Sequence, residues 1–129
     1  MVNCYYESGH VFARVLGDLT MLNVGRLIEQ VQQHVQDRGC WNVILDFSEV
    51  PVVDSAAIGT LVKLSRQAQS NDGYVLLASP NAHLLEVLYY SKLEKTLRPF
   101  ISVEKALEYA ESGEAAQPAA EEPPPAPKP

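Results

Sequence analysis

An acid and a hydroxyl stand side by side at Asp54 and Ser55, between an apolar run and a stretch of residues at helical spacing. Side chains of these types cap helix N-termini, because their oxygens accept hydrogen bonds from the unpaired backbone N–H groups of the first turn. The positive end of the helix dipole at the same place favours a negatively charged group. The pair therefore fits two roles, an ordinary helix cap or a serine that receives a phosphate.

No other polar residues converge in a way that indicates catalysis. The three histidines (His10, His34 and His83) lie in separate segments, and none stands beside an acid or nucleophile as a proton relay would require, so we expect solvated surface histidines. Asp46, Glu49 and Asp54 do not follow a known metal-ligand spacing, and we expect Asp46 and Asp54 to hold a loop by accepting backbone hydrogen bonds. The sequence therefore predicts a protein that is not an enzyme.

Cofactor sites are not indicated either. Cys4 and Cys40 are far apart and have no C-x-x-C spacing, so we expect free thiols without a metal. The chain has no phosphate-cradling glycine loop of the G-x-x-x-x-G-K-[ST] or G-x-G-x-x-G type, so we predict no cofactor and no self-contained nucleotide site.

The segments that would position Asp54 and Ser55 alternate between two periodicities. Residues 43–47 are mostly apolar and begin with two β-branched residues, as in a strand covered on both faces. Downstream, Ile58, Leu61, Val62, Ser65 and Ala68 recur at helical spacing. The expected elements are strands at 4–7, 11–16, 42–47, 74–78 and 99–101, with helices that end at Gly39, span 55–70, begin around Pro80 and span 103–110.

This order predicts the fold class and the domain organisation. Alternating strands and helices imply parallel pairing through right-handed crossovers, and the opening hairpin, with Ser8-Gly9-His10 as its turn, adds an antiparallel pair. We expect an α/β domain over residues 1–111, with a mixed sheet and about four helices. Residues 112–129 hold six of the nine prolines and no aromatic residue, which predicts a disordered tail with polyproline II character. Such a tail could enter an aromatic-lined groove, but an inert solubilising tail is the favoured interpretation.

Charge and hydropathy restrict the partners. The net charge of −6, with bases dispersed among acids, argues against direct nucleic-acid binding and favours a protein partner. No apolar run approaches 18 residues and the N-terminus lacks a basic start, so we expect a cytoplasmic protein without membrane insertion. Tyr89, Tyr90, Leu93 and Trp41 are candidates for an exposed binding surface, although we expect at least one of the two tyrosines in the core.

Two stretches carry a resemblance to a known family. Leu45-Asp46-Phe47-Ser48-Glu49-Val50, followed by Val53-Asp54-Ser55-Ala56-Ala57-Ile58-Gly59, resembles the signature of STAS domains of bacterial anti-sigma factor antagonists. Gly17-Asp18-Leu19-Thr20 and Ser79-Pro80-Asn81-Ala82 resemble flanking segments of that family, over roughly residues 3 to 111. The chain departs from the pattern at Thr20, in place of an acid, and at Ala56 and Ala57, in place of a serine or threonine and a glycine.

The resemblance implies a function. A member of this kind binds an anti-sigma factor serine kinase, and the kinase, which supplies the ATP, ends the binding by phosphorylating Ser55. The contact residues implied are Asp18, Asp54, Ser55, Ala56, Ile58 and Gly59. Two alternatives lack the phosphate switch: an accessory subunit of an ABC-type lipid transporter, which the departures at Ala56 and Ala57 keep open, and a scaffold subunit of a stress-signalling complex.

Overall fold

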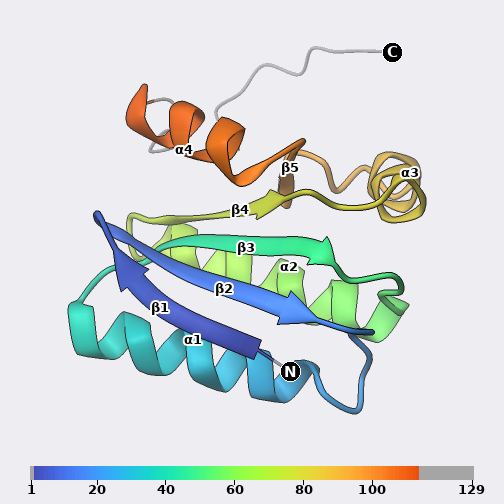
Figure 1. The fold of residues 1–129 in the computed structure, drawn as a ribbon, viewed down its shortest axis with the longest axis horizontal. Coiled ribbons are helices and arrows are strands. Elements are labelled where there is room, and N and C mark those ends of the chain that lie inside the picture. Colours follow the sequence, from blue (N-terminus) through green and yellow to red (C-terminus); the bar gives the residue numbers. More distant parts are fainter. Residues whose placement is uncertain (1, 114–129) are drawn as a thin grey trace.

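A five-stranded sheet with four helices makes up the computed structural model, which describes residues 2–113 (Figure 1). The strand order is β1-β2-β3-β4-β5; β1 and β2 are antiparallel and all other neighbours are parallel. The predicted fold class is confirmed. The elements are β1 Val2–Glu7, β2 His10–Leu16, α1 Val24–Arg38, β3 Asn42–Glu49, α2 Ser55–Ser70, β4 Tyr74–Ala78, α3 Ala82–Tyr90, β5 Arg98–Phe100 and α4 Val103–Glu111.

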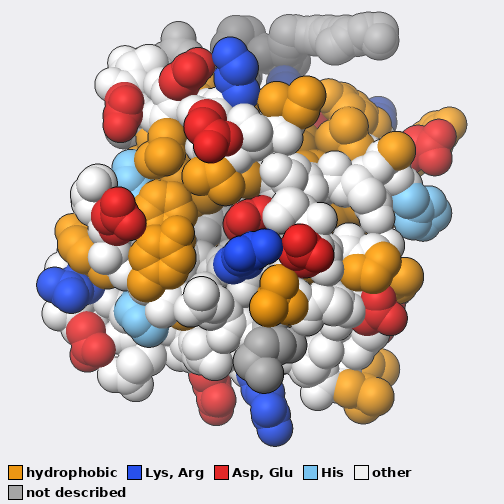
Figure 2. Space-filling model, viewed as in Figure 1, with side chains coloured by type: hydrophobic (Ala, Val, Ile, Leu, Met, Phe, Trp, Pro, Cys, Tyr) orange, Lys and Arg blue, Asp and Glu red, His pale blue; other side chains and the backbone are white. Residues whose placement is uncertain are grey.

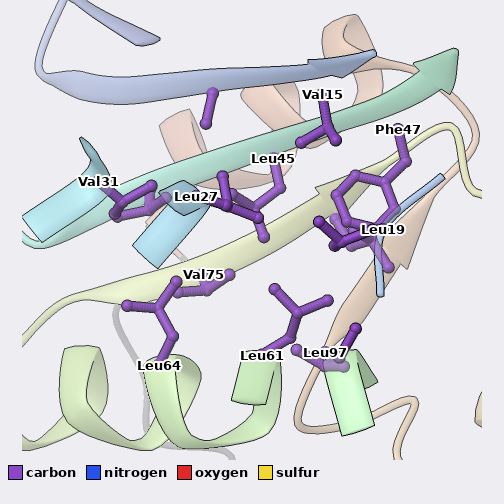
Figure 3. Packing of buried hydrophobic residues seen from close by; sticks show 14 of the residues in the cluster. Val15, Leu19, Leu27, Val31, Leu45, Phe47, Leu61, Leu64, Val75 and Leu97 are labelled. Carbon is purple, nitrogen blue, oxygen red and sulfur yellow. The ribbon is translucent and has the colours of Figure 1, made fainter. Parts of the chain in front are cut away.

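The two faces of the sheet are covered unequally. Alternate residues point to opposite faces of a strand, so Val43, Leu45 and Phe47 of β3 enter the main core while Ile44 faces α4. The main core is filled by side chains of α1, α2 and α3, and Figure 3 shows Leu61 and Leu64 of α2 among them. A smaller cluster beneath α4 covers only part of the other face. Phe12 of β2 belongs to this second cluster, whereas Tyr5 of the outer strand β1 is 43% exposed. Figure 2 shows hydrophobic side chains on the surface of the molecule in this view.

Local signals explain most of the element boundaries. Gly39 ends α1 in the left-handed conformation, as predicted, and α2 and β4 have the expected bounds. Pro80 does not lie in the first turn of α3. Asn81 caps that helix through a bond from the Leu84 N–H, at 2.8 Å, and Ala82 begins it. Pro80 therefore precedes the cap, and the prediction that α3 begins there was two residues early.

The hairpin turn is shorter than predicted, and this changes the environment of His10. Ser8 and Gly9 both have positive φ, as a two-residue turn that matches the twist of the strands requires. His10 thus belongs to β2 and is buried, with its Nε2 atom 2.7 Å from the Tyr74 hydroxyl oxygen. The prediction of surface histidines was therefore wrong for His10. It is confirmed for His83, which is exposed, whereas His34 is half-buried.

Aromatic residues also differ from expectation. Tyr89 and Tyr90 are both exposed, at 58% and 82%, so neither lies in the core as we expected for one of them. Trp41 is half-buried against the main core, and its carbonyl oxygen accepts the Tyr74 N–H at 3.0 Å. A Cβ atom built on the neighbouring Gly73 would lie 2.3 Å from that same oxygen, so only glycine fits there.

The two edges of the sheet have different lengths and chemistry. The outer strand β1 has six residues, all paired with β2 on one side only. At the opposite edge β5 has three residues, and the middle one is Pro99, which has no backbone N–H to donate.

The last helix, α4, ends at Glu111, and the domain boundary predicted at residue 111 stays a prediction. Ser112 and Gly113 follow that helix, and Gly113 has a φ of 89°, which turns the chain away from the helix axis. The predicted tail lies, from residue 114 onward, outside the described residues.

Candidate functional site

Two loops that are far apart in the sequence lie side by side at one end of the sheet. Because β2 and β3 are parallel, the loops after them, residues 17–23 and 50–54, both leave the sheet at the carboxyl ends of its parallel strands. Below, "this edge" and "the same edge" mean this end of the sheet. The Leu19 N–H donates to the Val52 carbonyl at 2.9 Å, and the Asp54 N–H donates to the Leu19 carbonyl at 3.1 Å. This pairing brings Asp18 to the same end of the sheet as Asp54 and Ser55, and the role of these residues in binding a partner stays a prediction.

Asp54 holds both loops with one carboxylate. Its Oδ1 atom accepts the Ala57 N–H at 2.8 Å and caps α2, while Oδ2 accepts the Met21 N–H at 3.0 Å from the other loop. Asp46 acts in a similar but local way, since its Oδ1 accepts the Ser48 N–H at 3.0 Å. The prediction that both carboxylates hold their loop through backbone hydrogen bonds is confirmed.

Ser55 is exposed as the first residue of α2. Because Asp54 caps the helix, Ser55 does not, and its hydroxyl has no hydrogen-bond partner among residues 2–113. The hydroxyl therefore stands free at the positive end of the helix dipole, where added negative charge is stabilised.

The exposed side of α2 next to Ser55 is made of small residues. Ala56 and Gly59 are exposed, and a Cβ built on Gly59 would have no neighbour within 4 Å, so packing within the chain does not require that glycine. Ile58, predicted as a contact residue, is 8% exposed and packs in the main core, so a partner would reach little of it. Ala57 is fully buried, so this departure from the family pattern does not alter the surface.

Sequence reasoning missed three exposed apolar side chains at this edge. Met21 is 69% exposed, Leu22 is 92% exposed and Val52 is 50% exposed. They lie beside the site because the Met21 N–H bonds Asp54 and the Val52 carbonyl bonds Leu19. A missed signal was available, since Met21 and Leu22 precede the apolar stripe of α1 and do not belong to its periodicity. Clustered exposed apolar side chains mark interaction surfaces.

Other residues fix this edge in place. Asn81, the cap of α3, donates its side-chain amide to the Pro51 carbonyl at 2.8 Å. Asn23 donates to the Asp18 carbonyl at 2.9 Å, while its own oxygen accepts the Thr20 N–H at 2.9 Å. Asp18 is itself exposed and borders a hollow of about 400 Å³ with Leu22 and Arg26. Hydrogen bonds from Asn81 and Asn23 to backbone groups therefore fix the two loops that carry the exposed side chains.

Residues 2–113 contain no group of three or more His, Cys, Asp or Glu side chains placed to hold a metal ion. None of the helices in this part of the chain has the length and hydrophobicity needed to cross a bilayer.

Comparison with known proteins gives one family and several relatives. A family model of the STAS domain matches residues 3–106. Solute carrier family 26 member 10 of Mus musculus is 40% identical over 70 residues, which is 52% of this chain and 10% of the carrier. A candidate anti-sigma factor antagonist of Thermotoga neapolitana is 28% identical over 72 residues, 56% of this chain and 64% of that protein.

A solved structure shows the same fold. The crystal structure of a candidate anti-sigma factor antagonist from Thermotoga maritima superposes with a TM-score of 0.78 and 21% identity, covering 85% of this chain and 94% of the other. The chain aligns with less than two thirds of the length of the Thermotoga neapolitana protein and with only a tenth of the length of the solute carrier.

Proposed function

The chain belongs to the STAS domain family, and from this premise we propose that it is a cytoplasmic anti-sigma factor antagonist. It binds an anti-sigma factor serine kinase through the edge that carries Asp18, Asp54 and Ser55. The kinase holds ATP and transfers its γ-phosphoryl group to Oγ of Ser55. The bond from the γ-phosphorus to the bridging oxygen of ADP breaks, ADP leaves, the hydroxyl proton passes to solvent, and the resulting phosphoserine ends the binding. The observation that supports this proposal most is the exposed, unbonded hydroxyl of Ser55 at the start of α2.

Charge explains why the switch acts on binding rather than on folding. A phosphate adds about −1.5 to −2 charges at pH 7, and a helix N-terminus stabilises negative charge by roughly 0.3–1 kcal/mol. Since Asp54 already supplies the cap, phosphorylation removes no bond that holds α2. The domain therefore stays folded, and the charge falls on the contact surface.

The surroundings of Ser55 make that charge unfavourable for a bound partner. Met21, Leu22 and Val52 are exposed apolar side chains that a partner would cover with apolar groups of its own. A dianion between this patch and Asp54 would lose its hydration on binding, and burial of an unpaired charge is strongly unfavourable. The small side chains Ala56 and Gly59 allow the partner to approach α2 closely, which makes the interface sensitive to added bulk.

The experiment that tests this proposal uses a serine kinase that co-purifies with the chain from its native cell. Its affinity is measured by calorimetry for the wild type, the phosphorylated protein, Ser55→Asp and Ser55→Ala. We expect the phosphorylated form and Ser55→Asp to lose binding, while Ser55→Ala binds and cannot be switched off. Ser70→Asp is the matched control, because Ser70 is an exposed serine at the other end of the same helix. Equal affinity of all forms would refute the phosphate switch.

One observation favours a second candidate. The relative with 40% identity is a solute carrier of which this chain matches 10% of the length, so a similar stretch occurs within a larger solute carrier. A STAS domain that binds a transporter or its ATPase, without a phosphate switch, would use the same edge of the sheet. Recovery of a transport protein instead of a kinase, with an affinity that Ser55→Asp leaves unchanged, would support this candidate over the first.

A further inference from the structure

A second exposed apolar region lies where α3, β5 and α4 meet. Figure 1 shows β5 between α3 and α4. Two hollows of about 270 and 250 Å³ adjoin there and share Tyr89, Pro99 and Phe100 in their walls. Tyr109 of α4 closes the first hollow, with its ring 5.1 Å from that of Phe100, and Ile101 borders the second and is 82% exposed. We call this feature the aromatic groove.

We propose that the aromatic groove binds the proline-rich segment 118–129 of the same chain. Pro123, Pro124, Pro125 and Pro127 favour the polyproline II helix, which loses little entropy on binding and which aromatic-lined grooves recognise. The inference is independent of the role of Ser55.

Chain geometry favours an intramolecular complex. Gly113, two residues after α4, has a φ of 89° and so turns the chain away from the helix direction, and Tyr109 of the groove lies only four residues before it. If extended, the segment from Gly113 to Pro123 would span up to about 31 Å, at about 3.1 Å per residue. The nine residues of α4 span about 13.5 Å, at 1.5 Å each, so the connecting segment is long enough to run back along the whole helix. A tether of this kind gives an effective concentration of millimolar order, so even weak docking is populated.

Polar groups of the groove match the segment as well. One carboxylate oxygen of Glu94, a wall residue of the first hollow, is buried without a hydrogen-bond partner within residues 2–113. Buried acceptors are normally bonded, and the N–H of Ala126 or the ammonium group of Lys128 could supply the donor. Lys95, an exposed wall residue, complements the acidic pair Glu121 and Glu122 that precedes the prolines.

The test is nuclear magnetic resonance on the full chain. We expect nuclear Overhauser contacts between the ring protons of Tyr89 and Tyr109 and protons of Pro123–Pro125. Replacing Pro123, Pro124 and Pro125 together by glycine should remove these contacts and shift the resonances of Phe100. Tyr89→Ser should have the same effect, whereas Tyr90→Ser, which alters a neighbouring tyrosine that does not line the groove, should not.

Three results would overturn the proposal. One is the absence of contacts between these rings and the prolines in the wild-type chain. Another is an equal response of the spectrum to Tyr89→Ser and Tyr90→Ser. The last is loss of the contacts on tenfold dilution, which would show that the groove holds the segment of a second copy.

Discussion

Replacing Asp54 by alanine should lower the free energy of unfolding by about 2 kcal/mol, although the residue lies on the surface edge of the domain. Loss of an N-cap costs about 1 kcal/mol, and here it removes the bond to the Ala57 N–H. The bond from the Met21 N–H contributes about 1 kcal/mol more, below the roughly 1.5–3 kcal/mol typical of bonds to charged groups, because water can replace this exposed one.

Two milder substitutions separate these contributions. Asp54→Ser keeps a capping oxygen for Ala57 but is too short to reach Met21, so it should cost about 1 kcal/mol. Asp54→Asn keeps one acceptor and turns an amide toward the Met21 N–H, so it should cost a similar amount. Asp18→Ala is the matched control, because the Asp18 side chain is exposed and makes no bond within the described part of the chain, and should change stability by less than about 0.5 kcal/mol.

Urea unfolding followed by far-ultraviolet circular dichroism measures these differences. With a slope of about 1–3 kcal/mol/M, Asp54→Ala should lower the midpoint by about 1 M at an unchanged slope. An Asp54→Ala midpoint equal to that of Asp18→Ala would show that the carboxylate does not hold the two loops together. Equal costs for Asp54→Ser and Asp54→Ala would instead refute the contribution of the cap.

Three further predictions concern single residues. Ser55→Ala should change the free energy of unfolding by less than about 0.5 kcal/mol, because Asp54 is the cap; a larger loss in a urea melt would contradict this. Gly73→Ala should lower the free energy of unfolding by about 1–3 kcal/mol, because the new methyl group meets the Trp41 carbonyl. Gly59→Ala should raise the free energy of unfolding by about 0.5–1 kcal/mol, because Gly59 lies in a helix with open space around it. Thermal melts of both variants measure these differences. Burial, with a smaller effect of Cys40, raises the pKa of Tyr74 to about 12 from 10.0, so its contribution to stability should be present below pH 10 and be lost as the pH rises to about 12. Stability measured across that range should fall less in Tyr74→Phe; equal losses would contradict the assignment.

The fold could be predicted from the sequence because local signals and hydrophobic periodicity agreed. The bounds of α2 and β4 follow from Asp54 and from the Asn71-Asp72-Gly73 turn, where the helical period stops. Pro80 misled the prediction of α3 because a nearby asparagine was the better cap. His10 was misplaced because burial depends on Tyr74, which is 64 residues away in the sequence.

The site could be predicted only in part. The type and position of Asp54 and Ser55 indicated a helix start, but which of the two is the cap depends on side-chain geometry that spacing does not fix. The bond from Met21 to Asp54 joins residues 33 positions apart and exists only because β2 and β3 lie parallel. For the same reason the exposure of Leu22 and Val52 at one edge could not be read from their apolar character.

The unequal edges of the sheet set a limit on self-association. Addition of a strand needs an edge with free N–H and C=O groups, which β1 offers over six residues. The three-residue strand β5 contains Pro99 and offers little to pair with. A filament needs two edges that can each accept a neighbour, whereas one usable edge permits only a closed pair related by a twofold axis. Pairing of strand edges would therefore favour a closed dimer over a filament, because β5 is short and contains Pro99.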